Sequence, residues 1–246
     1  MMTRLHAFLI HLGVSLMIFL GLAWLIVYQW YPGLFLDTDG GWRGLRIILA
    51  VDLVLGPLLT LIVFKPNKPG LRTDLTLIGA LQMLCLLAGT WIVHSERPIA
   101  VVYVEGRFTS MSADDYVLAQ GKRLPDLTDY PGPSPKWVKV QLPEDSDQRA
   151  ELRARTIRTG QTLNTQVNTY VPFSALDPDF LSEAQNLSEI VANPAWAKRL
   201  DNWLNTHNQD IENLALFTFS TRYVFGYLVY HRKTLTQVGL ITHLDD

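Results

Sequence analysis

The chain has 246 residues, of which 48% are hydrophobic, and its 21 basic and 23 acidic residues give a net charge of −2. Most of the charge lies after Ser95, where 15 basic and 19 acidic residues leave the C-terminal part acidic. An acidic part without a basic stripe argues against nucleic acid as a partner. The one cysteine, Cys85, excludes an internal disulfide.

Three long apolar runs occupy the N-terminal part of the sequence, at residues 7–27, 45–64 and 75–93. Each has about the 20 residues that an α-helix needs to cross a hydrocarbon layer ~30 Å thick. The first run is longer than the apolar region of a cleaved signal peptide. Three such runs in succession also argue against a buried soluble hairpin. We therefore predict a membrane domain over residues 1–94 with three transmembrane α-helices.

The basic residues that flank the three runs predict the orientation of this domain. One side carries Arg4, Lys65, Lys68 and Arg72, and the other carries Arg43, Arg46 and Arg97. This small excess, together with tryptophan and tyrosine residues clustered at the second interface, predicts a cytoplasmic N-terminus. The C-terminal part would then lie in the periplasm of a bacterium, with the spans in its inner membrane.

The segment VDLVLGPLLTLIVF, in the second run, combines a carboxylate, Asp52, with a helix-breaking pair, Gly56 and Pro57. Pro57 donates no backbone hydrogen bond and its ring clashes with the carbonyl group of Leu53, which predicts a kink beside the carboxylate. Gly56 would allow another helix to approach closely at this point. A charged side chain in a membrane span is costly and is expected to face a bundle interior or a cavity.

Position along each run converts to depth in the membrane at about 1.5 Å per residue. Asp52 and Thr90 come out nearer the periplasmic face, and His11 and Gln82 nearer the cytoplasmic face, which predicts two pairs of neighbours. Three interpretations of these residues stay open. They are structural hydrogen bonds between helices, a contact for the helix of another protein, and a proton or ion relay. The different depths of Asp52 and His11 disfavour the relay.

The C-terminal part, residues 95–246, has the pattern of an α+β domain around an antiparallel sheet. Strands are expected at 98–106 and 136–142, and three more at 214–221, 223–231 and 235–242. A short helix is expected to begin after the cap Ser112 and to stop at Gly121. Further helices are expected at 145–160 and at 182–205, the latter interrupted at Asn193-Pro194.

Motifs of known enzyme classes are missing from the sequence. It contains no CxxC, HExxH, GxSxG, GxxxxGK[ST] or GxGxxG motif. The histidines of the C-terminal part are too far apart in sequence to show the spacing of metal ligands. Its carboxylate pairs stand where helix starts and turns need them. We therefore predict no catalytic residue, no cofactor and no metal site.

Several segments, in this order, resemble the TfpX/TfpZ family of type IV pilin accessory proteins. They are RLHAFLIHLGVSL, WYPGLF, VDLVLGPLLTLIVF, DLTLIGALQ, ERPIAVVYVEGRF with SADD, and LALFTFSTRYVFGYL. The resemblance implies a non-enzymatic inner-membrane protein with three spans and a periplasmic domain. It also implies a partner, the cognate type IV pilin, and beyond it the pilus assembly machinery, with a chaperone-like role in assembly.

On this resemblance we expect the second span, with Asp52, Gly56 and Pro57, to pack against the pilin helix. The soluble domain would hold the pilin head, for example along an open sheet edge by strand addition. Two alternatives are a membrane-bound pilin-modifying enzyme and a small transporter subunit, the latter resting on Asp52 alone. A sensor is disfavoured because the expected cytoplasmic segments are too short to carry an output domain.

Overall fold

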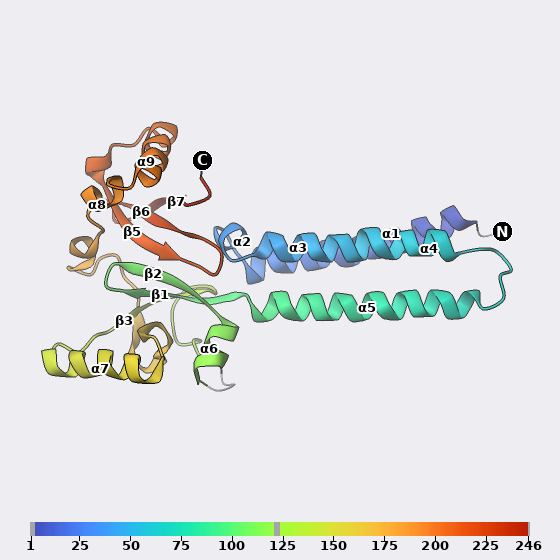
Figure 1. The fold of residues 1–246 in the computed structure, drawn as a ribbon, viewed down its shortest axis with the longest axis horizontal. Coiled ribbons are helices and arrows are strands. Elements are labelled where there is room, and N and C mark those ends of the chain that lie inside the picture. Colours follow the sequence, from blue (N-terminus) through green and yellow to red (C-terminus); the bar gives the residue numbers. More distant parts are fainter. Residues whose placement is uncertain (1–2, 121–123, 246) are drawn as a thin grey trace. The chain divides into compact units, whose positions relative to one another are not determined.

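The computed structural model describes residues 3–120 and 124–245. The chain forms two compact units, Met1–Arg97 and Pro98–Asp246, which we call the membrane unit and the soluble unit (Figure 1). The membrane unit is helical, and the soluble unit is built on a β-sheet with helices around it. Three long apolar helices followed by an α+β domain confirm the predicted fold class.

The membrane unit contains three continuous helical spans, Arg4–Trp30, Gly41–Val63 and Leu71–Ser95, each long and apolar enough to cross a membrane. Two of them include π-helical segments. The bounds are α1 Arg4–Leu25, η1 Ile26–Trp30, α2 Phe35–Thr38, α3 Gly41–Leu49, η2 Ala50–Leu55, α4 Gly56–Val63 and α5 Leu71–Ser95. Spans two and three each begin four residues before the apolar run that predicted them, and this shift changes the depth of their polar residues.

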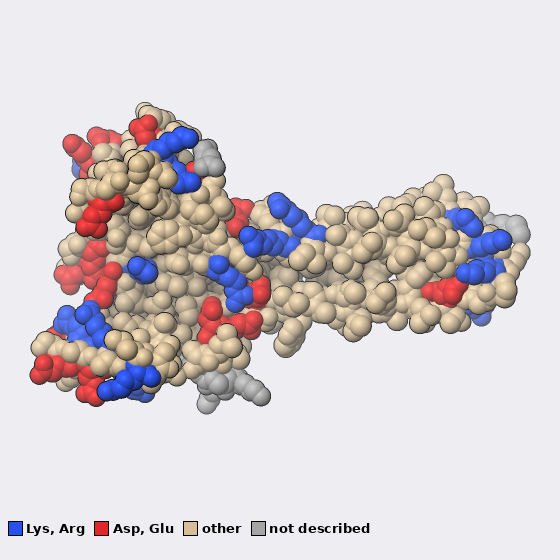
Figure 2. All heavy atoms as spheres, viewed as in Figure 1, with Lys and Arg blue, Asp and Glu red and all other residues tan. Residues whose placement is uncertain are grey.

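Local signals explain where these helices begin. The hydroxyl group of Thr3 accepts a hydrogen bond from the backbone N–H of His6 and so caps α1. Gly40 and Gly70, directly before α3 and α5, have φ angles of +93° and +80°, a conformation that glycine adopts without strain. On the face shown in Figure 2, Lys and Arg side chains gather near the two ends of the helical unit, and the surface between them shows no charged side chains.

The soluble unit contains a seven-stranded sheet with the order β4-β3-β1-β2-β5-β6-β7. The strands are β1 Pro98–Val104, β2 Arg107–Ser112, β3 Lys136–Val140, β4 Tyr170–Pro172, β5 Leu214–Ser220, β6 Phe225–His231 and β7 Gln237–Thr242. The helices are α6 Ala113–Gln120, α7 Ser146–Thr159, α8 Leu187–Val191 and α9 Pro194–His207, with 3₁₀ turns at Leu163–Thr165, Val167–Thr169, Phe180–Glu183 and Ile211–Asn213.

The sheet is mixed, whereas the sequence predicted an antiparallel one. β1 and β3 pair in parallel, as do β2 and β5, and the other neighbours are antiparallel. The prediction missed β2, the second strand of a hairpin whose turn residues Glu105 and Gly106 both have positive φ. β2 reads RFTSMS, a polar stretch that does not carry the apolar pattern of a strand.

Two predicted helix starts are confirmed in the soluble unit, the cap at Ser112 and the new helix that begins at Pro194. Ser112 and Asp115 bond reciprocally at the start of α6, each side chain accepting from the backbone N–H of the other. The side chain of Asn193 accepts from two backbone N–H groups at the start of α9, and Pro194 follows as its first residue. The predicted stop of α6, Gly121, lies outside the described residues.

Aromatic side chains fill the core of the soluble unit. Phe180 and Phe217 stack with ring centroids 4.2 Å apart, and Tyr103, Phe108 and Tyr230 pack around them. Such offset stacks add to the stability that apolar burial provides. This cluster holds the centre of the sheet together between β1, β2, β5 and β6.

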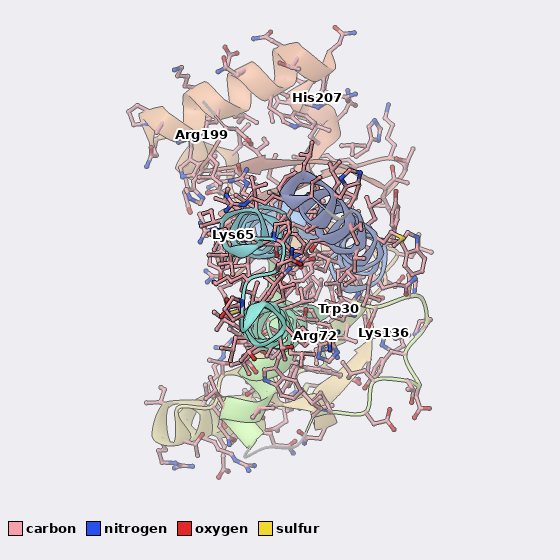
Figure 3. The ribbon with its side chains drawn as sticks, turned by 90° about the vertical axis from the view of Figure 1, so that its right-hand side faces the viewer. Trp30, Lys65, Arg72, Lys136, Arg199 and His207 are labelled. Atoms are coloured by element: carbon pink, nitrogen blue, oxygen red, sulfur yellow. The ribbon has the colours of Figure 1, made fainter. Side chains whose placement is uncertain are left out.

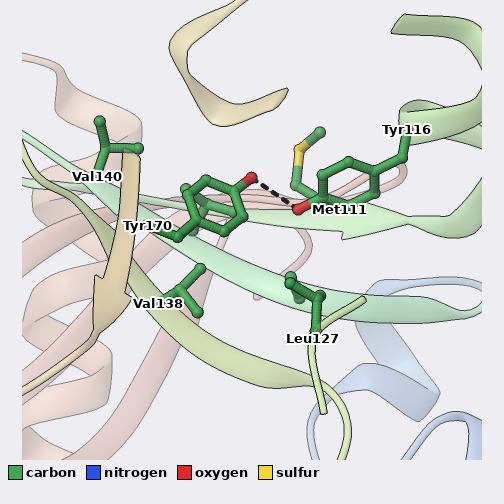
Figure 4. Packing of buried hydrophobic residues seen from close by; sticks show 8 residues of the cluster. Met111, Tyr116, Leu127, Val138, Val140 and Tyr170 are labelled. Atoms are coloured by element: carbon green, nitrogen blue, oxygen red, sulfur yellow. Dashed lines mark hydrogen bonds between the residues drawn. The ribbon is translucent and has the colours of Figure 1, made fainter. Parts of the chain in front are cut away.

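A second cluster, drawn in Figure 4, packs beside α6. The hydroxyl groups of Tyr116 and Tyr170 are hydrogen-bonded at 2.8 Å within it. Burial raises the pKa of both phenols, so both keep their protons at neutral pH. Tyr170 donates onward to the carbonyl group of Asn164, which leaves Tyr116 as the donor to Tyr170. These buried hydroxyls are therefore satisfied and structural.

Candidate functional site in the membrane unit

Asp52 lies in the interior of the membrane unit, with only 1% of its surface exposed. It belongs to the π-helical segment Ala50–Leu55, directly before Gly56 and Pro57. A proline inside a helix removes one backbone hydrogen bond and crowds the preceding turn, and a widened π turn relieves that crowding. The sequence predicted a kink beside the carboxylate, and the structure has a widened π-helical turn directly before Gly56 and Pro57.

The π turn explains the first contact of Gln82. In this register the N–H of Gly56 bonds to the carbonyl group of Val51, five residues earlier. The next N–H along would belong to residue 57 and would bond to the carbonyl group of Asp52, but Pro57 has none. Gln82 Nε2 takes this place and donates to the Asp52 carbonyl oxygen at 3.2 Å. A side chain of α5 thus replaces a missing backbone donor of the second span.

The same amide also bonds to the Asp52 side chain. Gln82 Nε2 donates to Asp52 Oδ1, and Ser15 Oγ donates to the same oxygen at 3.2 Å. Gln82 Nε2 further contacts Ser15 Oγ at 3.1 Å. The second carboxylate oxygen, Oδ2, is buried and has no hydrogen-bond partner among residues 3–120 and 124–245. All three spans therefore meet at one carboxylate, which is only half satisfied.

His11 extends this network along α1. Its Nε2 lies 2.9 Å from Gln82 Oε1, and its Nδ1 lies 2.6 Å from Thr60 Oγ1. Because a carbonyl oxygen can only accept, Nε2 carries a hydrogen and donates to Gln82. We call the five residues the Asp52 cluster: Asp52, Gln82, Ser15, His11 and Thr60.

Of the two pairs of neighbours predicted from depth in the membrane, one is found in the structure and the other is not. His11 and Gln82 are hydrogen-bonded, as their depths indicated. The pairing of Asp52 with Thr90 was wrong, because Asp52 bonds to Ser15 and Gln82 while Thr90 is a half-buried residue elsewhere on α5. Spans two and three begin earlier than their apolar runs, which brings Asp52 and Gln82 both close to mid-span. His11 and Asp52 therefore belong to one hydrogen-bond network through Gln82. A difference in depth no longer argues against coupling between them.

Ser15 and Thr60 were missed by the sequence analysis, although helical spacing could have found them. Ser15 follows His11 by four residues and Thr60 follows Gly56 by four, so each lies on the same helix face as a residue already chosen. Hydroxyl groups on such a face hydrogen-bond between helices in membranes.

Gly56 and Pro57 are buried as well. A Cβ atom at Gly56 would run into the side-chain amide of Gln82, so the close approach that glycine permits is made by α5 of the same chain. The chain's own helices cover Asp52, Gly56 and Pro57. This burial fits the interpretation of Asp52 and its neighbours as structural hydrogen bonds between the helices of one chain.

The loop between α4 and α5 gathers the basic residues of one end of the unit. Figure 3 looks along the helices toward Lys65 and Arg72, which lie near the facing end. Lys68 in the same loop forms an ion pair with Asp74 at 2.6 Å. Over the described part of the chain, no group of three His, Cys, Asp or Glu side chains is placed to hold a metal ion.

Comparison with known proteins gives no matching family model and no matching solved structure. A fimbrial assembly protein of Dichelobacter nodosus, serogroups C1 and C2, is 32% identical over 111 residues, which cover 44% of this chain and 85% of that protein. The chain belongs to this family of fimbrial assembly proteins. The membrane unit of this chain contains three helices that are long and apolar enough to cross a membrane.

Two longer members from Dichelobacter nodosus, named fimbrial assembly proteins of serogroup I and serogroup E1, are 29% and 28% identical over 145 residues. The match covers 58% of this chain, and the chain spans about half the length of these two relatives, 56% in each case. The resemblance to a pilus-assembly family is thereby confirmed at the level of the fimbrial assembly proteins.

Proposed function

We propose that this protein is an inner-membrane accessory protein of type IV pilus assembly. It binds the cognate pilin before or during assembly, in a chaperone-like and non-catalytic role. The observation that carries the proposal is membership of the fimbrial assembly family by a chain with three apolar spans. Type IV fimbriae and type IV pili are the same structures. Before assembly, their subunit, pilin, is anchored in the membrane by one apolar helix.

Because Asp52, Gly56 and Pro57 are buried, we expect the pilin contact on the outer faces of the helices. Leu77, Leu81, Leu84 and Trp91 are exposed on α5, and their spacing of four, three and seven residues places them on one face. With its polar groups turned inward, the unit presents this face to lipid or to another apolar helix. A pilin helix is the partner that family membership suggests for it.

Strand addition at the soluble unit has less support, because one edge strand of the sheet is short and the other has a backbone N–H that is already bonded. β4 has only three residues, and short edge strands are a common defence against pairing with other chains. At the other edge, the N–H of Thr242 in β7 already donates to Asp245 Oδ2 at 2.6 Å. We therefore place the first pilin contact in the membrane, with the soluble unit in the periplasm beside the pilin head.

A photo-crosslinking amino acid tests this face directly. At Leu84, which is exposed on α5, it is expected to form a covalent adduct with pilin in native membranes. The same amino acid at Leu86, which is buried on the same helix, is the matched control and is expected to form none. Immunoblots for pilin read the adduct. No adduct at any exposed position of the three spans would contradict a pilin contact in the membrane.

A further inference from the structure

Helix α7 of the soluble unit is long, but it buries none of its side chains. It spans 14 residues, and none of them is buried. In water an isolated helix of about 12–15 residues is only marginally stable, and most helices in proteins are stabilised by packing of an apolar face. Leu152 and Thr156 are half-buried and supply part of that packing. The rest of the α7 surface is open to a contact from outside the described chain.

The charge of α7 is opposite to that of the unit that carries it. α7 contains four of the 15 basic residues that follow Ser95, but two of the 19 acidic ones. Of the four arginines, Arg153 alone forms an ion pair within the described residues, with Glu105 in the turn between β1 and β2. Arg149 donates to two backbone carbonyl oxygens, which carry no net charge. The positive charge of α7 is therefore complementary to an acidic partner.

One face of α7 combines two of these arginines with small and apolar side chains. Residues three and four apart share a face of a helix, and six such residues line an open hollow of about 510 Å³. We call them the α7 face: Ser146, Arg149, Ala150, Arg153, Ala154 and Ile157. The Ile157 side chain is 84% exposed, and the small alanine side chains leave space beside it. The face thus offers an apolar contact next to two guanidinium groups.

The chemistry of the α7 face favours a protein segment over a lipid surface. Guanidinium groups bind carboxylates through two parallel hydrogen bonds, so acidic side chains fit beside Arg149 and Arg153. A helix that lies on a membrane carries Trp, Phe or Leu along its apolar face. The α7 face has none of these three residue types. An acidic protein segment with an apolar side chain for the hollow is therefore the partner that this face fits.

We propose that the α7 face binds an acidic segment of the pilin head, as a second contact besides the one in the membrane. This inference rests on the proposed function, which makes pilin the protein held beside the soluble unit. An apolar side chain of the segment packs against Ile157 and the alanines, and its carboxylates pair with Arg149 and Arg153. The two contacts use different units of the chain, so each can fail without the other.

Photo-crosslinking of the full-length protein in native membranes tests the α7 face. With the crosslinking amino acid at Ile157, or at Ala150 on the same face, we expect an adduct that immunoblots identify as pilin. Val191 is exposed on α8, which Figure 1 draws away from α7, and at this control position we expect no adduct. Equal pilin adducts at Val191 and Ile157 would overturn the proposal, as would an adduct with a second copy of this chain in place of pilin.

A pair of variants separates the Arg153 guanidinium group from the ion pair that it forms. Arg153→Gln and Glu105→Gln both remove this ion pair, but Glu105→Gln keeps the arginine. With the crosslinking amino acid at Ile157, Arg153→Gln is expected to lower the yield of pilin adduct about threefold, the effect of one exposed ion pair. Glu105→Gln is expected to keep or raise the yield. Equal losses in the two variants, or no loss in Arg153→Gln, would overturn the proposal.

The crosslink in the membrane distinguishes failure of this inference from failure of the proposed function. A pilin adduct at Leu84 on α5, with none at Ile157 and Ala150, would overturn the α7 contact and leave the proposed function standing. Absence of a pilin adduct at every exposed position of the spans and at the α7 face would contradict both.

Discussion

Replacing Gln82 with leucine is expected to lower the free energy of unfolding of the membrane unit by about 2–4 kcal/mol. One intramembrane hydrogen bond contributes roughly 0.6–2 kcal/mol, and this change removes the partners of three groups together. The Asp52 carboxylate, the Asp52 carbonyl group and His11 Nε2 all lose a bond to the same amide. Denaturant titration in mixed micelles, followed by tryptophan fluorescence, measures the loss.

A double-mutant cycle shows whether the loss comes from the network. Asp52→Leu combined with Gln82→Leu removes both partners and leaves no buried carboxylate, so it is expected to cost less than the sum of the single variants. Thr90→Val, on the same helix but outside the cluster, is expected to stay within about 0.5 kcal/mol of wild type. Additive single effects would show that Gln82 and Asp52 do not act together.

Gly56→Leu is expected to cost about 1–3 kcal/mol through overpacking. The new side chain occupies the position of the Gln82 amide and pushes α5 away from the second span. Gly79→Leu is the matched control, because Gly79 lies on α5 with no atom within 4 Å of a Cβ built there. Gly79→Leu is therefore expected to leave the unfolding midpoint within error of wild type, and equal losses at the two glycines would refute the close approach at Gly56.

These two predictions give a way to interpret a loss of pili in variants at Gln82 and Gly56. Variants of Gln82 and Gly56 are expected to reduce the amount of folded protein in the membrane, and fewer pili would follow from that loss. Variants of the exposed face, such as Leu84→Ala, are expected to keep the protein level and to weaken the pilin contact. Comparing protein level with piliation for both kinds of variant separates the scaffold from the docking face.

The spans and the fold class could be predicted from the sequence because both depend on local composition. Length and apolarity alone identify a membrane helix. The cap at Asn193 and the proline after it likewise mark the start of α9 without any tertiary information. Depth in the membrane was less accurate, because the helix around Arg43 and Arg46 begins before its apolar run does.

Strand pairing could not be predicted in the same way. The parallel contacts of β1 with β3 and of β2 with β5 join segments far apart in sequence, and no local pattern records them. The orphan oxygen of Asp52 is also invisible in the sequence, since it depends on which helices meet at that level. Ser15 is the intermediate case, because its helical spacing from His11 was readable once the site was known.

Co-purification of pilin with the tagged full-length protein, at native expression from detergent-solubilised membranes, tests the central claim most directly. Mass spectrometry of the eluate is expected to identify the major pilin, and the deletion strain is expected to carry fewer surface pili and a smaller pilin pool. Absence of pilin from the eluate, with normal piliation in the deletion strain, would contradict the account and leave only the three spans and the α+β unit in place.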